Sequence, residues 1–490
     1  MYSFLISFAA LVLGYLIYGS FVERVFGADP TRKTPAVEKA DGIDFIPMPT
    51  WKVFMIQFLN IAGTGPIFGA IMGAKFGPSA YLWIVFGCIF AGAVHDYLTG
   101  MLSVRHGGAG LPELVGTYLG KSTRAVMLCF SVLLLLLVGA VFVYSPAEIL
   151  KDMAGDGTSR SFMVWVAVIF VYYIIATLMP IDKIIGKIYP IFAISLIFMA
   201  VALMAGLLVR WPSIPEFWDG LANRGPSAGV AGQPIFPCLF ITIACGAISG
   251  FHATQSPLMA RCIKNERLGR SVFYGSMITE GMVALVWAAV SSWFFFDGGA
   301  ANVGSDLSAS APTVVTLVSR SWLGTLGAIL ALLGVVAAPI TSGDTALRSG
   351  RLIIAEALRF DQKSPRKRLT ISIPMFVVVA LILWYNIADA NGFNTIWRYF
   401  GWANQTLAVF SLWAATVYLA RARKGAYWLI TLVPAVFMTA VCTTYICTAK
   451  IGLNLPMDWN AAIGGITALL SAVLFFLWLR KDRRTVHSPS

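Results

Sequence analysis

The sequence predicts an all-α polytopic membrane protein with about 13 transmembrane helices. Three observations support this fold class. The chain has 490 residues, of which 58% are hydrophobic and 12% are charged, whereas soluble domains have about 25% charged residues. Apolar stretches of roughly 20 residues, the length that crosses a bilayer, recur along the chain. Lys and Arg residues concentrate in alternate loops between these stretches, as the positive-inside rule requires.

The predicted spans cover residues 3–22, 51–73, 79–104, 123–146, 162–181, 188–210, 235–260, 271–296, 322–347, 370–389, 397–420, 427–448 and 460–479. The first has no basic segment before it and no small-residue cleavage site after it, so it is interpreted as a retained helix. Most Lys and Arg residues lie after odd-numbered spans, which places the N-terminus outside and the C-terminus inside the cytoplasmic (inner) membrane of a prokaryote. The same distribution accounts for the net charge of +13 without a nucleic-acid partner.

The second span is interrupted near its middle by residues that break helices. Irregular backbone at membrane depth is tolerated only where protein buries it or a watery cavity meets it, and transporters use such breaks to bind substrates and ions. Glycine allows close approach of a ligand, and the half-helix after the break offers free N–H groups to a carboxylate. The first candidate substrate-binding set is therefore Asn60, Gly63, Thr64, Gly65 and Pro66. A kink that serves only helix packing is the alternative.

The seventh span, residues 235–260, carries a second interruption. Its candidate set is Cys245, Gly246, Ser249, Gly250, His252, Ala253 and Gln255. Gly246, Ser249, Gly250, His252 and Gln255 are the members expected to bind substrate. Gly246 and Gly250 also form a GxxxG pair, which is typical of close helix packing. His252 is an ionisable group in an apolar span, for which a functional role is the default interpretation, and its titration range suits proton coupling. A hydrogen-bonded core histidine is the alternative.

Span 2 starts inside and span 7 starts outside, so the helices from 2 to 6 and from 7 to 11 have opposite orientations. This predicts the five-plus-five inverted repeat of many secondary carriers, with helices 2 and 7 broken. We expect one transmembrane domain over residues 1–490. Its parts are a peripheral first helix and cytoplasmic loop (1–50), repeat 1 (51–210), repeat 2 (235–420) and two peripheral helices (427–480).

Buried acidic residues are the candidates for ion coupling. His95 and Asp96 lie in the third span, with Asp96 about 13 Å from its cytoplasmic end at 1.5 Å per residue. A charged aspartate there costs about 2.5–3.5 kcal/mol on insertion scales, so it needs a partner. Glu280 lies midway along the eighth span without a basic neighbour, and a lone buried carboxylate favours the proton-bound form. An ion pair or helix cap at Asp96, and a hydrogen bond between helices at Glu280, are the alternatives.

A neutral set in the ninth span could bind a cation instead. Thr341 and Ser342 follow Ala338 by three and four positions, which places one carbonyl and two hydroxyls on one helix face. Hard cations prefer such oxygen ligands, although hydroxyls also join helices in membranes. The bound cation expected at such a site is Na⁺. No other cofactor and no metal site is predicted, because the seven cysteines form no CxxC pair.

Three long segments occur in the order FLNIAGTGPIFGAIMGAKFG, GCIFAGAVHDYLTGMLSVRHGGAGLPEL and LFITIACGAISGFHATQSPLMARCI. They resemble the carbon starvation protein A family. The resemblance implies uptake of peptides or pyruvate, and the leucine-transporter-like fold of the amino acid–polyamine–organocation superfamily. It also implies that the helix of Ala338, Thr341 and Ser342 supplies a sodium site completed by carbonyls of the first broken helix. The chain resembles a short member of the family, so its substrate stays open.

These observations predict a secondary active transporter and not an enzyme. It would import small carboxylates or short peptides, held between broken helices 2 and 7 and driven by a proton or sodium gradient. The expected partners are therefore the substrate, H⁺ or Na⁺, and the lipid bilayer. A channel or facilitator without ion coupling, or a membrane nutrient sensor, is the alternative. A channel would favour rings of like polar side chains, and a sensor would need a signalling domain, neither of which the sequence indicates.

Overall fold

The computed structural model describes residues 1–42, 44–154, 157–178, 181–228, 232–362, 364–389, 392–422 and 425–487, and all regular structure in these residues is helical. The helices are α1 (Tyr2–Leu13), α2 (Gly19–Phe26), α3 (Pro35–Glu38), α4 (Thr50–Ile61), α5 (Ala70–Ala74), α6 (Ser79–Gly87), α7 (Ala93–Arg105), α8 (Leu111–Leu119), α9 (Lys121–Ala154), α10 (Ser159–Leu178), α11 (Ile181–Arg210), α12 (Ile235–Thr242), α13 (Gly250–Ala260), α14 (Gly275–Phe296), α15 (Gly299–Asn302), α16 (Ala311–Ala357), α17 (Pro365–Ala388), α18 (Gly392–Ala422), α19 (Leu429–Thr448) and α20 (Met457–His487). Single π-helical turns join α1 to α2 and α6 to α7. Another leads from the loop after α13 into α14.

The described residues contain ten helices that are long and apolar enough to cross a membrane, or eleven if the bent α4–α5 pair counts as one span. The chain is therefore a multi-span membrane protein. The two other predicted spans correspond to the α12–α13 pair and to α18, which are not among these eleven. The number thirteen stays a prediction.

Both expected interruptions are present. In the first, α4 ends at Ile61, three residues are not helical, and a π-helical turn (Gly65–Gly69) leads into α5 at an angle of 54° to α4. In the second, α12 ends at Thr242 and α13 begins at Gly250, with seven non-helical residues between them. The first break follows from Gly63, Gly65 and Pro66, which weaken or remove the helical hydrogen bonds.

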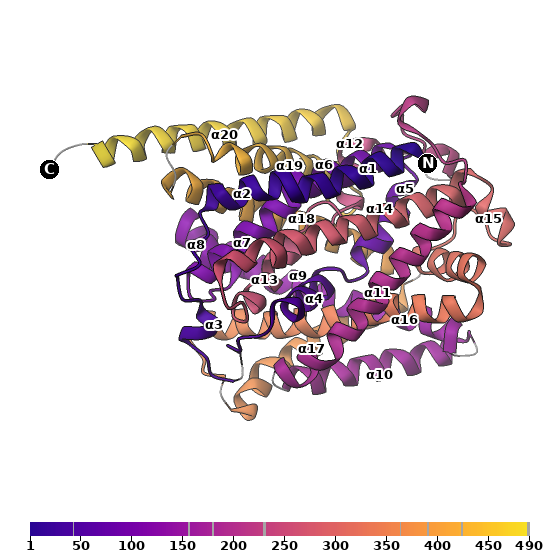
Figure 1. Cartoon of the computed structure of the whole chain (residues 1–490), viewed down its shortest axis with the longest axis horizontal. Helices are drawn as coiled ribbons and strands as arrows, with labels where there is room; N and C mark the ends of the chain where they lie inside the picture. Colours follow the sequence, from indigo (N-terminus) through magenta and orange to yellow (C-terminus); the bar gives the residue numbers. More distant parts are fainter. Residues whose placement is uncertain are drawn as a thin grey trace.

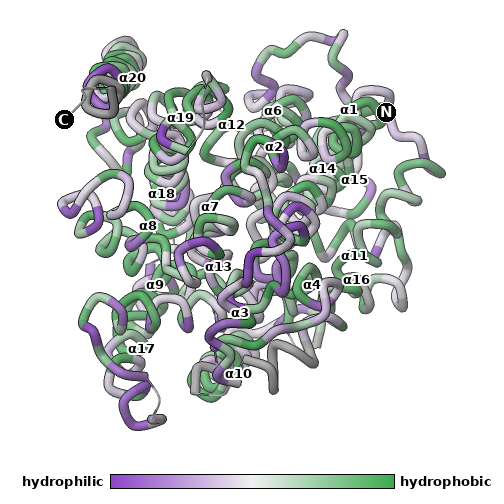
Figure 2. The backbone as a smooth tube through the Cα atoms, turned by 60° about the vertical axis from the view of Figure 1, so that its left-hand side comes forward, coloured by the Kyte–Doolittle hydropathy of each residue, from purple (hydrophilic) through white to green (hydrophobic). Residues whose placement is uncertain are grey.

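The helices run side by side, and the start of α1 and the end of α20 lie at opposite ends of the bundle (Figure 1). Helices α19 and α20 form one edge, and α10 and α17 form the opposite edge, with α4, α7, α13 and α14 between them (Figure 1). In Figure 2 hydrophobic residues predominate along the helices, while hydrophilic residues gather in segments such as that around α3. This pattern is that of a bundle whose outer helices face lipid.

Burial distinguishes the outer helices from the inner ones. Every residue of α13 is buried, and so is every residue of α7 from Ala93 to Val104. The outer helices instead expose large apolar side chains, such as Leu381 of α17 and Leu474 of α20. Helix α13 contacts α4, α7 and α18, so its polar side chains are surrounded by other helices.

Candidate functional site

The two breaks are in direct contact. Gly65, at the start of the turn after the first break, lies so close to Cys245 of the second break that a Cβ at position 65 would clash with the Cys245 Sγ and Cβ atoms. A Cβ at Gly69 would lie 2.8 Å from the carbonyl oxygen of Thr242. Glycine is therefore required for the close approach of the two interrupted helices. The space at Gly65 is filled by the Cys245 side chain, so a bulky residue there would disturb packing whether or not a ligand binds nearby.

The first candidate set is fully enclosed. The side chains of Asn60 and Thr64 have no solvent exposure, and Gly63, Gly65 and Pro66 are buried as well. The Oδ1 and Nδ2 atoms of Asn60 and the Oγ1 atom of Thr64 have no hydrogen-bond partner among the described residues. A buried polar atom left unpaired costs about 1–3 kcal/mol. The first break therefore presents three polar atoms that a bound molecule could satisfy.

Part of the second candidate set faces a different helix. Ser249 Oγ donates a hydrogen bond of 3.0 Å to Asn404 Oδ1 of α18, and the backbone N–H of Phe251 donates one of 2.6 Å to the same oxygen. Gly250 packs so tightly on the α18 backbone at Asn404 that a Cβ would clash. Asn404 thus caps the start of α13. The free N–H groups at this end are partly occupied by protein.

Two further members of that set, Gly246 and Gln255, differ in their surroundings. Gly246 packs against Ala284 of α14, where a Cβ would clash with the alanine methyl group. Gln255 Nε2 donates to Thr254 Oγ1 at 2.9 Å, and Gln255 Oε1 has no partner among the described residues. Gly246 therefore acts in packing, whereas Gln255 keeps one free acceptor.

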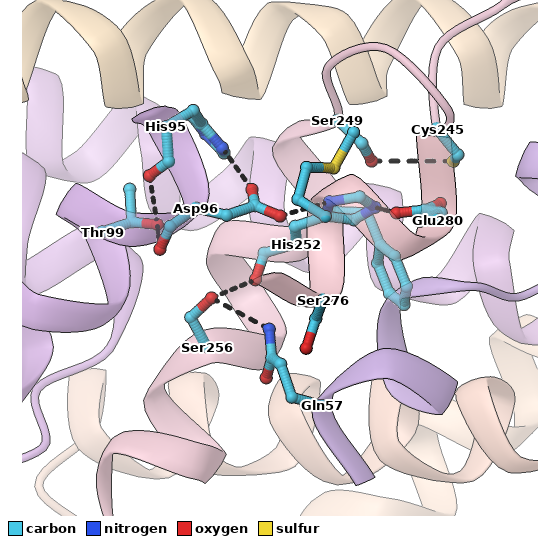
Figure 3. A network of polar contacts seen from close by, with 12 residues as sticks. Gln57, His95, Asp96, Thr99, Cys245, Ser249, His252, Ser256, Ser276 and Glu280 are labelled. Carbon is cyan, nitrogen blue, oxygen red and sulfur yellow. Dashed lines mark hydrogen bonds and ion pairs between the residues drawn. The ribbon is translucent and has the colours of Figure 1, made fainter. Parts of the chain in front are cut away.

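Four of the predicted ionisable residues form one buried chain (Figure 3). His252 Nδ1 lies 2.8 Å from Asp96 Oδ2, and His252 Nε2 lies 3.3 Å from Glu280 Oε2. The other Asp96 oxygen lies 2.8 Å from His95 Nδ1. All four side chains have no solvent exposure. The structure therefore brings α7, α13 and α14 together around His252.

The two contacts of His252 are unequal. The contact with Asp96 is a hydrogen bond, whereas the contact with Glu280 is at ion-pair distance without hydrogen-bond geometry. If His252 carries a proton on each nitrogen, the two carboxylates leave the chain one negative charge in excess. Buried charge that is not compensated is costly, so a proton on Glu280 would neutralise the chain.

The candidate sodium site of Ala338, Thr341 and Ser342 also contacts the first broken helix. Ser342 Oγ donates to the carbonyl oxygen of Leu59 on α4 at 2.8 Å. Thr341 Oγ1 donates within its own helix to the carbonyl oxygens of Ala337 and Ala338, both at 2.9 Å. The expected oxygen ligands are thus near one another. Both hydroxyls nevertheless have hydrogen-bond acceptors without an ion.

Sequence reasoning missed one residue of this region, Asn404. Asn404 is followed by Gln405 within the eleventh span, and this polar pair was a usable signal. Cys245 belongs to the second candidate set, but the sequence assigns it no chemical role, because a buried cysteine is common in apolar segments. Cys245, His252 and Glu280 each offer a ligand atom, and these atoms lie within 4.8 Å of one another. This cluster could hold a metal ion.

The chain matches the family described as "Carbon starvation protein CstA" over residues 1–210, 150–321 and 307–445. An "Uncharacterized membrane protein" of Haemophilus influenzae is 48% identical over 58% of this chain and 89% of its own length. A "Peptide transporter CstA" of Campylobacter jejuni is 27% identical over 94% of this chain and 81% of its own. A "Pyruvate/proton symporter BtsT" of Escherichia coli is 24% identical over 91% of this chain and 81% of its own.

Solved structures share the fold. A manganese transporter of Eremococcus coleocola matches with a TM-score of 0.60 at 13% identity, over 91% of this chain and 99% of that one. The nucleobase-cation-symport-1 family transporter Mhp1 matches with a TM-score of 0.54 at 14% identity, over 88% of this chain and 93% of that one. The bundle is therefore of the kind found in leucine-transporter-like carriers, which agrees with the predicted class.

Proposed function

The chain belongs to the carbon starvation protein CstA family of membrane transporters, and we propose that it is a proton-coupled importer of a small carboxylate or a short peptide. The observation that carries the proposal is the buried chain Asp96–His252–Glu280 beside the two helix breaks. Its relatives are named as peptide transporters and as a pyruvate/proton symporter. These names do not favour a sensor or an uncoupled channel.

The substrate would bind beside the first break. Asn60 and Thr64 supply unpaired donors and acceptors there, and the half-helix that starts at Gly65 would add a positive dipole end for a carboxylate. The N–H groups of Ile67 and Phe68 in this half-helix already donate to the Thr64 carbonyl oxygen. Gln255 adds one acceptor from α13. Both relatives' substrates, pyruvate and peptides, carry a carboxylate, which fits this arrangement.

Proton transfer would use His252 as the central group. An imidazole between two carboxylates can accept a proton on one side and release it on the other. Opening of the bundle would expose Glu280 or Asp96 to one side of the membrane, and closure would bury the proton together with the substrate. Because Cys245 touches Gly65, movement of one broken helix would press on the other.

The finer architecture is part of the same proposal. We propose thirteen spans, with repeat 1 in residues 51–210 and repeat 2 in residues 235–420 in opposite orientations, and peripheral segments at 1–50 and 427–480. The N-terminus would lie outside and the C-terminus inside the inner membrane of a prokaryote, as the distribution of Lys and Arg indicates. Cysteine-accessibility labelling should then find residues 298–311 outside and 361–368 inside.

Sodium is the second candidate for the coupling ion. Ser342 and the Leu59 carbonyl already lie 2.8 Å apart, and Thr341 with the Ala338 carbonyl is adjacent. A sodium ion would draw on these same oxygens. Their complete hydrogen bonding without an ion makes this set the weaker of the two.

The proposal is tested by uptake into proteoliposomes that contain the purified protein. Radiolabelled pyruvate and a labelled dipeptide are offered in turn, with unlabelled pyruvate, peptides and amino acids as competitors. One class should be taken up and should compete with itself, and empty liposomes provide the control. Uptake of neither class, by protein that remains folded and monodisperse, would contradict the proposed substrate.

A further inference from the structure

We propose that Cys245, His252 and Glu280 form a binding site for one thiophilic divalent metal ion such as Zn²⁺. The inference goes beyond transport of an organic substrate, although the site shares His252 and Glu280 with the proposed proton chain. Cys245 comes from the second break, His252 from α13 and Glu280 from α14. The three ligands therefore belong to three separate segments that packing brings together.

The distances suit a small tetrahedral ion. The Cys245 Sγ atom, a ring nitrogen of His252 and a carboxylate oxygen of Glu280 all lie within 4.8 Å of one another, and His252 Nε2 is 3.3 Å from Glu280 Oε2. Zn²⁺ binds sulfur at about 2.3 Å and nitrogen or oxygen at about 2.0–2.2 Å, so tetrahedral neighbours lie about 3.3–3.7 Å apart. The nitrogen–oxygen pair already has this separation, and the sulfur, which lies within 4.8 Å of both, would move by at most about 1 Å.

Two of the three ligand side chains have atoms without a hydrogen-bond partner among the described residues. These atoms are His252 Nε2 and both Glu280 oxygens, and both side chains are completely buried. The two side chains point toward each other in Figure 3. Buried polar atoms are normally satisfied, and a bound ion would satisfy His252 Nε2 and one Glu280 oxygen at once.

Neighbouring groups hold His252 and Cys245 in place by hydrogen bonds. Asp96 holds His252 Nδ1 at 2.8 Å, which leaves the Nε2 lone pair for a metal, and such a carboxylate–histidine contact is typical of metal sites. Ser249 Oγ and Asn404 Nδ2 lie 3.6 Å and 3.7 Å from Cys245 Sγ. Asn404 Nδ2 is a donor and would stabilise a thiolate, whereas the Ser249 hydroxyl proton is already donated to Asn404 Oδ1.

The mixed ligand set selects the class of metal. Thiolate and imidazole favour Zn²⁺ and similar ions over Mg²⁺ or Ca²⁺, which prefer oxygen. Three protein ligands leave a fourth position open, as in sites that exchange a ligand. Binding requires the Cys245 thiolate and a free His252 Nε2, so protons are released as the metal enters. Metal and coupling proton would exclude each other, and Zn²⁺ would hold the transporter inactive.

The test uses the purified full-length protein in detergent with Co²⁺ as a spectroscopic probe. We expect one Co²⁺ per protein, a thiolate-to-cobalt charge-transfer absorption, and displacement by Zn²⁺. Cys245→Ser should lose the charge-transfer band and bind about 10–100-fold more weakly. Cys262→Ser is the matched control, because Cys262 is also buried but lies at the other end of α13, and it should keep both properties. Glu280→Gln should keep the charge-transfer band with weakened binding.

No stoichiometric Co²⁺ binding by folded wild-type protein would overturn the inference, as would a charge-transfer band that survives Cys245→Ser. Size-exclusion elution and thermal unfolding establish that each variant is folded. Proton-driven uptake is measured on the same metal-free preparation. Its absence would count against the proposed function and leave the metal-binding result unaffected.

Discussion

The two interrupted helices meet at Gly65 and Cys245 yet differ in chemistry. Around the first, the polar side chains are the neutral Asn60 and Thr64, whose polar atoms are unpaired among the described residues. Around the second, His252 lies between two carboxylates from neighbouring helices. Under the proposed function the two breaks would have separate roles: the first would hold the substrate, and the second would hold the proton. Their contact would then couple the two.

The largest expected effect is at the second break. Glu280→Gln keeps much of the shape and hydrogen-bonding capacity of the side chain but cannot cycle a proton. One pH unit supplies about 1.4 kcal/mol per proton, which corresponds to about tenfold accumulation for one proton per substrate. The variant should lose this accumulation and still exchange substrate across the membrane. Counterflow and gradient-driven uptake in proteoliposomes measure the two activities, and accumulation equal to wild type would contradict the role of Glu280.

The contact between the breaks gives the next effect. Gly65→Ala should destabilise the protein by about 1–3 kcal/mol, as is typical of overpacking, because the added methyl group would clash with Cys245. Cys245→Gly in the same chain should restore much of the thermal stability in detergent. Gly401→Ala is the control, since its Cβ would have a nearest neighbour at 3.5 Å. A Gly65→Ala variant as stable as wild type would show that the breaks are not in close contact.

A smaller effect is expected at the first break. Asn60→Ala should raise the KM for substrate about tenfold, since one or two hydrogen bonds of about 0.5–1.5 kcal/mol each would be lost. The stability of the substrate-free protein should change little, because the Asn60 amide is unpaired in the described residues. Asn386→Ala is the matched control, as Asn386 is a buried amide on α17 with both polar atoms likewise unpaired. Equal KM changes in both variants would remove Asn60 from the substrate site.

The smallest effect is expected at the candidate sodium site of Ala338, Thr341 and Ser342. Replacing both Thr341 and Ser342 by Ala removes hydrogen bonds to carbonyl groups, each worth about 0.5–1.5 kcal/mol. A proton-coupled carrier should keep uptake within about twofold of wild type. Initial rates with and without sodium provide the measurement. Loss of a sodium-dependent component would transfer the coupling role from the second break to this set.

The helix breaks could be predicted from the sequence, because Gly and Pro act on the local backbone. Glu280 and His252 could be identified as well, since an ionisable residue stands out in an apolar span. Their pairing could not be predicted: Asp96 and His252 are 156 residues apart, and single-sequence periodicity contains no information on the register between helices. The cap provided by Asn404 arises in the same way from packing between α18 and α13. The span count stays a prediction at α12–α13, where seven non-helical residues separate two short helices, and at α18.

The central claim is that protons, acting through His252 and Glu280, drive the carrier. Its most direct test is uptake by wild-type protein under an imposed pH gradient, acid outside, without sodium, followed by uptake under a sodium gradient at equal pH. We expect accumulation above equilibrium in the first case and only equilibration in the second. Accumulation driven by sodium alone, or by neither gradient, would contradict the account.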